Sequence, residues 1–157
     1  MSFKNILCFG TLNPDLIYFV DELPNKGDDI RSLNSSIRPG GTAINCSELI
    51  SLWDKSVHVR GNSIGSDPMG KYLVDYLKEN NINFDGLIIN QSLTPTCSIF
   101  VDSSGERTIV SSGYEGLEWS NFENLNNFDS LIIDRYSIKF IKDKLKDLKK
   151  QNNLFVC

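Results

Sequence analysis

Short apolar runs and amphipathic segments alternate along this chain. Four apolar runs bounded by turn residues predict buried strands, at residues 5–9, 57–61, 130–134 and 154–157. Stretches with apolar side chains at helical spacing predict helices, at residues 43–53, 68–79 and 138–148. Strands that alternate with helices indicate an α/β layer architecture with a parallel sheet.

The second of these helices has the best-marked ends. Asp67 is suited to the N-cap, Pro68 to the first helical position, and Asn80-Asn81 to the stop. The third helix carries a run of lysines that Asp143 and Asp147 interrupt. Such a run is typical of a solvated helix face rather than of a phosphate or nucleic-acid site.

Two further segments predict pairs of extended strands, 16–20 with 30–37 and 96–102 with 107–112. The second pair is a predicted hairpin, because apolar and polar residues alternate on both sides of a short loop that contains Gly105. We expect the four strands to form a small antiparallel appendage to the α/β sheet.

The composition excludes several classes of protein. The 157 residues include 16 Lys and Arg against 20 Asp and Glu, so the net charge of −4 gives no electrostatic footprint for nucleic acid or an anionic membrane. Four cysteines and one histidine lack zinc spacing, so no metal site and four free thiols are predicted. No run approaches 18 apolar residues, and the apolar run Ile6–Phe9 is too short for a secretion signal, so neither export nor membrane insertion is predicted. A cytoplasmic protein is predicted.

Two glycines precede the first predicted helix, in the sequence Pro39-Gly40-Gly41-Thr42. Glycines before a helix N-terminus let the backbone approach a ligand and present amide donors to it. Asn45, one turn into the helix, is placed to add side-chain contacts. An ordinary Gly-Gly turn is the alternative interpretation of this motif by itself.

Asn13 and Asp15 follow the first predicted strand directly. Ligands of open α/β sheets bind beyond the carboxyl ends of strands, so these two side chains are placed to bind a polyol. A carboxylate and an amide together accept from and donate to adjacent hydroxyls. Local turn chemistry around Pro14 is the alternative.

In combination these motifs resemble the ribokinase or PfkB family of ATP-dependent carbohydrate kinases. The resemblance covers residues 5–135 and rests on short patterns in the family's order: Asn13-x-Asp15, Leu23-Pro24-x-x-Gly27-Asp28, Pro39-Gly40-Gly41-x-x-x-Asn45, Gly65-x-Asp67-x-x-Gly70 and Asp102-x-x-Gly105-Glu106-Arg107-Thr108. It implies a partial three-layer αβα sheet with a small antiparallel β lid, whose strands lie within residues 16–37 and 95–112.

The resemblance also implies roles for single residues. The positions that match the family's sugar contacts are Asn13, Asp15, Gly40, Gly41 and Asn45. Cys97 and Ile99 fall where family members present small or apolar side chains toward the sugar, and Asp134-Arg135 falls near a further polar substrate contact. The implied activity is transfer of a γ-phosphate to a hydroxyl of a sugar or nucleoside, with ATP and Mg²⁺ as cofactors.

The catalytic base that the family uses is absent from this sequence. The family places it in a Gly-x-Gly-Asp motif of the C-terminal half, beside the ATP site, and no such motif occurs here. We therefore expect residues 1–157 to be the substrate-binding half of such a kinase, inactive alone, with a C-terminal half or a second copy bound through the lid strands as partner. The alternative is a non-catalytic sugar-binding or dimerisation module.

Overall fold

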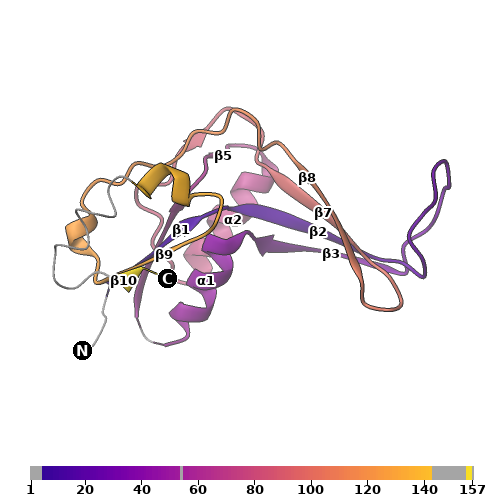
Figure 1. Cartoon of the computed structure of the whole chain (residues 1–157), viewed down its shortest axis with the longest axis horizontal. Coiled ribbons are helices and arrows are strands. Elements are labelled where there is room, and N and C mark those ends of the chain that lie inside the picture. The colour runs from indigo at the N-terminus through magenta and orange to yellow at the C-terminus, as the bar shows by residue number, and fades with distance from the viewer. Residues whose placement is uncertain (1–4, 54, 143–154, 157) are drawn as a thin grey trace.

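The structure of the protein is a computed structural model that describes residues 5–53, 55–142 and 155–156. It contains two four-stranded sheets (Figure 1). One belongs to an α/β body, and the other projects from the body as a lid.

The body sheet is parallel throughout, as the sequence predicts. Its strand order is β10 (Phe155–Val156), β9 (Ser130–Ile133), β1 (Asn5–Gly10) and β4 (Ser56–Gly61). β1 is central and pairs with both β4 and β9. Because the strands run parallel, their carboxyl ends meet at one edge, and the lid begins from this edge.

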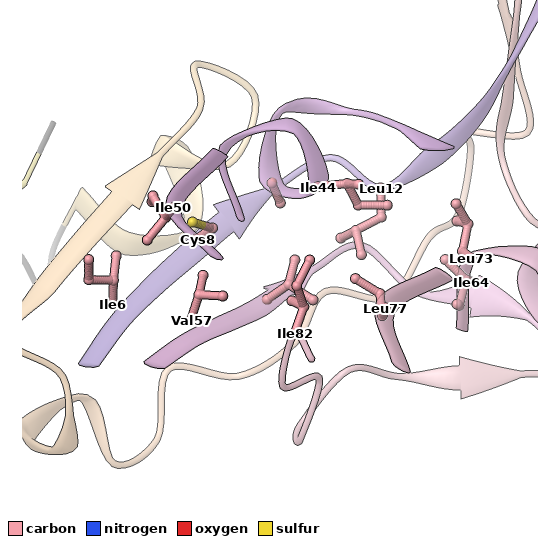
Figure 2. Close-up of a cluster of buried hydrophobic side chains, with 12 residues drawn as sticks. Ile6, Cys8, Leu12, Ile44, Ile50, Val57, Ile64, Leu73, Leu77 and Ile82 are labelled. Carbon is pink, nitrogen blue, oxygen red and sulfur yellow. The ribbon is translucent and has the colours of Figure 1, made fainter. Parts of the chain in front are cut away.

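Alternate residues of β1 enter two separate apolar clusters. Ile6 and Cys8 face the helices α1 (Thr42–Ser51) and α2 (Pro68–Glu79), as Figure 2 shows. Leu7 and Phe9 face the opposite side, where Phe122, Leu125, Phe128 and Ile141 cover the sheet. The sheet is thus covered on both faces, and the three-layer arrangement is confirmed.

The helix predictions are confirmed where the structure describes them. α1 and α2 agree with the predicted spans, and the Asp67 carboxylate caps α2 by accepting from the Gly70 amide at 2.8 Å. Residues 138–142 are helical, and the rest of the third predicted helix lies outside the described residues. No helix among the described residues is long and apolar enough to cross a membrane.

The lid sheet is mixed, which corrects the expectation of an antiparallel lid. Its order is β3 (Asn34–Gly40), β2 (Asn13–Phe19), β7 (Thr96–Val101) and β8 (Arg107–Ser112). β2 with β3 and β7 with β8 are antiparallel pairs, but β2 and β7 pair in parallel. β2 and β7 are parallel because both run outward from the body. The local alternation in the sequence predicts the pairs β2–β3 and β7–β8, but it does not predict how the two pairs join.

Two shorter elements complete the structure. A 3-10 turn spans Leu125–Asn127 and packs on the body sheet. β5 (Ile64–Gly65) and β6 (Ile89–Asn90) form a two-stranded parallel sheet. Asp67 links this region to the start of the lid hairpin, because its carboxylate also accepts from the amide and hydroxyl of Thr94 at 2.8 and 2.7 Å. The Gly65-x-Asp67-x-x-Gly70 motif therefore has a structural role at the junction.

Candidate substrate-binding site

A cavity of about 1090 Å³ lies between the lid and the carboxyl ends of the body strands. Its lining includes most of the residues that the sequence singles out, namely Asn13, Asp15, Gly41, Asn45, Cys97 and Ile99. The fold thus brings together residues from β2, the α1 N-terminus and β7.

Asn13 and Asp15 form the floor of this cavity at the start of β2. The buried Asn13 amide donates to Asp15 Oδ1 at 2.7 Å and to the Pro14 carbonyl at 3.3 Å. Burial raises the pKa of Asp15, although the hydrogen bond from Asn13 opposes the rise. The half-buried carboxylate therefore gains when a ligand supplies hydroxyl donors to it.

The two glycines before α1 make room for this floor. Gly40 is not part of the cavity lining, but a Cβ there would lie 2.3 Å from Asp15 Oδ2. Gly41 has φ +84°, and a Cβ on it would lie 2.2 Å from the Thr11 carbonyl oxygen and 3.0 Å from Asn13 Oδ1. Glycine at these positions allows the α1 N-terminus to approach the floor closely.

Two amides at the start of α1 donate hydrogen bonds within the chain. The Thr42 amide donates to Thr11 Oγ1 and the Ala43 amide to the Thr11 carbonyl, each at 3.2 Å. Thr11 is the residue that the sequence analysis missed here. The exposed side chain of Asn45 still lines the cavity and is available to a ligand.

The inner face of the lid continues the floor. Asp15 is the register partner of Cys97 on β7, and Cys97 is the partner of Ser111 on β8. Ile99 and Ile109 form the next cross-strand pair along β7 and β8 on the same face. The lid therefore presents polar groups beside the floor and an apolar pair further out.

Tyr114 is a second site residue that sequence reasoning did not identify. Its hydroxyl donates to Asn13 Oδ1 at 2.8 Å and lies 3.7 Å from Cys97 Sγ. Burial, followed by the contact with Cys97, raises the pKa of Tyr114, so the phenol stays protonated. The sequence signal was a tyrosine two residues after a lid strand, between Gly113 and Gly116, and both glycines have positive φ in the structure.

Asp134 is buried, and both oxygens of its carboxylate accept hydrogen bonds within the chain. Oδ2 accepts from the Thr11 amide at 2.8 Å, and Oδ1 accepts from the Ser137 amide and hydroxyl, each at 2.8 Å. These bonds join the ends of β1 and β9. Of the pair Asp134-Arg135, only the exposed Arg135 lines the cavity.

Within residues 5–53, 55–142 and 155–156, no group of three or more His, Cys, Asp or Glu side chains could hold a metal ion. The sequence also contains no Gly-x-Gly-Asp. We therefore assign no Mg²⁺ ligand in this part of the chain.

The fold and the site together define a class, an α/β protein with a β lid over a cavity suited to a small polyhydroxyl ligand. Comparison with known proteins narrows this class. The model described as pfkB family carbohydrate kinase matches residues 4–156, so the chain belongs to the pfkB family of carbohydrate kinases. The family expected from the motifs is confirmed.

Individual relatives are similar over part of their length. The chain is 30% identical to ketohexokinase of Mus musculus over 112 residues, 70% of this chain and 37% of that protein. It is 28% identical to ribokinase of Dictyostelium discoideum over 108 residues, 68% of this chain and 34% of that protein. The chain thus spans about a third of the length of the curated relatives it matches.

A solved structure supports the fold assignment. The ribokinase from Giardia lamblia superposes with a TM-score of 0.76 at 21% sequence identity, over 99% of this chain and 50% of that one. The ribokinase-like α/β fold is therefore confirmed, although at this identity the likeness concerns the fold alone.

Proposed function

We propose that this chain is the substrate-binding, lid-bearing part of an ATP-dependent kinase that phosphorylates a hydroxyl of a sugar or nucleoside. The observation that carries the proposal is the cavity in which Asn13, Asp15 and Asn45 converge beneath the lid. Membership of the pfkB family and the names of the relatives, ribokinase and ketohexokinase, favour a pentose or ketohexose.

The site residues would bind and orient the sugar. The ionised Asp15 carboxylate accepts hydrogen bonds from hydroxyls, and the Asn45 amide both donates and accepts. Asn13 is held between Tyr114 and Asp15, so it fixes the direction of the carboxylate rather than adapting to the ligand. The lid strands exclude water from the bound sugar, which supports transfer over hydrolysis.

ATP, when bound with Mg²⁺, supplies the phosphoryl group. The base and the nucleotide site belong, in this proposal, to a C-terminal half, so this chain alone binds the sugar without turning it over. Co-expression with the C-terminal half of a related kinase should then restore turnover. Phosphorylation of ribose, fructose or adenosine by the purified chain alone would refute its catalytic incompleteness.

Titration calorimetry with ribose, fructose and adenosine tests the site itself. Asp15→Ala removes the half-buried acceptor, and we expect at least one of these ligands to bind the wild type and to lose about tenfold or more in affinity. Asp75→Ala is the matched control, because Asp75 is exposed on α2 and outside the cavity lining. Unchanged affinity in Asp15→Ala would refute the placement.

A second candidate is a non-catalytic sugar-binding or dimerisation module derived from the kinase fold. The observation that favours it is the exposed apolar side chains on the outer face of the lid edge strands, Ile37 on β3 and Val110 on β8. Saturable sugar binding with no turnover in the presence of ATP and a C-terminal half would favour this module over the kinase.

A further inference from the structure

A loop of two residues, Thr11 and Leu12, separates the central body strand β1 from lid strand β2. Asn13, the first residue of β2, and Asp15 form the floor of the candidate site. The position of this floor relative to the body therefore depends directly on the loop.

Asn62 binds the loop from one side, at Leu12. It directly follows β4, which pairs with β1, and its side chain is fully buried. Asn62 Oδ1 accepts from the Leu12 amide at 2.8 Å, and Nδ2 donates to the carbonyls of Leu12 at 3.0 Å and Ser63 at 2.9 Å. A single side chain thus binds both backbone groups of Leu12.

Asp134 binds the loop from the other side, at Thr11. It directly follows β9, the second neighbour of β1. Asp134 Oδ2 accepts from the Thr11 amide at 2.8 Å and from the Thr11 hydroxyl at 3.1 Å. Gly10 allows this approach, because a Cβ there would lie 2.7 Å from the same oxygen. The loop is therefore bound from the ends of both strands that flank β1.

Buried polar side chains need a physical reason in this core. Burying them costs free energy unless their polar atoms are hydrogen-bonded, and an apolar residue of similar shape avoids that cost. Every polar atom of the Asn62 and Asp134 side chains is hydrogen-bonded within the chain. A fully satisfied buried network specifies one arrangement of the groups that it joins. Here that arrangement is the conformation of the loop before the floor.

We propose that Asn62 and Asp134 are positioning residues of the candidate site, which fix the loop so that the floor is in place before a ligand binds. Neither residue lines the cavity, so both act through the loop rather than by contact with the sugar. This inference rests on the proposed function and adds two residues to its site. Binding groups that are held in place in advance lose less conformational freedom on binding, so loss of either residue should weaken it.

Amide hydrogen exchange of the full chain, followed by nuclear magnetic resonance, tests the loop without a ligand. We expect the amides of Thr11 and Leu12 to exchange as slowly as those in the ladder of β1, because both donate to buried side chains. Asn62→Ala should speed exchange of the Leu12 amide about tenfold, and Asp134→Ala should do the same for Thr11. Rapid exchange of either amide in the wild type overturns the proposal, whether or not the variants fold.

Titration calorimetry connects the loop to the site. For each of ribose, fructose and adenosine that binds the wild type, Asn62→Ala and Asp134→Ala should each lower the affinity about tenfold. Val59→Ala is the matched control, because Val59 is fully buried on β4 but packs in the apolar core. This control should lose stability in urea unfolding and keep the wild-type affinity.

The outcomes separate this inference from the proposed function. A variant that keeps the wild-type affinity overturns the positioning role of its residue, and an equal loss in Val59→Ala overturns the role of both; in either case the proposed function stands. Failure of all three ligands to bind the wild type counts against the proposed function itself. The exchange of the Thr11 and Leu12 amides then still decides whether the two side chains fix the loop.

Discussion

The body sheet and the lid sheet have the same number of strands but are stabilised differently. In the body, five of the six residues of β1 are buried, and helices and loops cover both faces. In the lid, every residue of β8 is exposed, and Ile99 is the only large aliphatic or aromatic side chain of the four lid strands that is buried. The body therefore holds the fold, and the lid leaves its inner face available for a ligand.

The largest expected difference between the two sheets is in stability. Leu7→Ala empties a fully buried position in β1, so the free energy of unfolding should fall by about 2–5 kcal/mol. Ile109→Ala in lid strand β8 removes a half-exposed side chain and should cost less than about 1 kcal/mol. Urea unfolding followed by circular dichroism measures both. Equal losses would show that the lid is as tightly packed as the body.

The next largest effect on stability is expected at the junction between the two sheets. Asp67→Ala removes the N-cap of α2 and the hydrogen-bond acceptor for Thr94, the residue before the lid hairpin. The free energy of unfolding should therefore fall by about 1–2 kcal/mol. Asp75→Ala on the exposed face of α2 is the control. If both variants unfold at the same urea concentration as the wild type, Asp67 does not join the two regions.

Asp67 also has a predictable pH dependence. Burial opposes its ionisation, but hydrogen bonds from Thr94 and Gly70 outweigh burial and lower its pKa. A lowered folded-state pKa means that Asp67 stabilises the fold above its ordinary pKa, near 3.8, and that this stability is lost as the pH falls through the lowered value.

A smaller effect is expected where the lid loop meets the floor. Tyr114→Phe keeps the ring but removes the donor to Asn13 Oδ1, so Asn13 no longer holds Asp15 in one orientation. Sugar affinity should fall about threefold to tenfold, the equivalent of one hydrogen bond. Tyr18→Phe is the matched control, because Tyr18 lies on β2, stacks on Phe100 and is outside the cavity lining. Equal affinities in the two variants would contradict the positioning role.

The sequence predicted the body better than the lid, because the body depends on local patterns. The apolar run of β1 and the Asp67-Pro68 helix start are signals within a few residues, and both were confirmed. The parallel pairing of β2 with β7 joins Asp15 to Cys97, and no local pattern specifies contacts across such a separation.

The same distinction holds within the site. Asn13, Asp15, Gly41 and Asn45 are recognisable because they lie in short motifs beside predicted elements, and the fold places them in one cavity. Thr11 and Tyr114 act instead through contacts between distant segments. Thr11 accepts hydrogen bonds from the first amides of α1, and the Tyr114 hydroxyl, beyond the end of β8, donates to Asn13. Such partners can be identified only once the sheets are assembled.

The smallest expected effect is the pH dependence of sugar binding. Burial raises the pKa of Asp15, so between its ordinary value near 3.8 and the raised value the folded chain binds more protons than the unfolded chain does. Lowering the pH through this window therefore stabilises the fold, because the buried Asp15 carboxylate becomes neutral. At lower pH the fold loses the stability that the ionised Asp67 contributes. Sugar hydroxyls donate to the ionised carboxylate, so affinity should be flat near neutral pH and should fall as Asp15 takes up its proton. Calorimetry from about pH 7 to about pH 4 measures this, and Asp15→Asn should abolish the step. A step that persists in Asp15→Asn would assign the titration to another group.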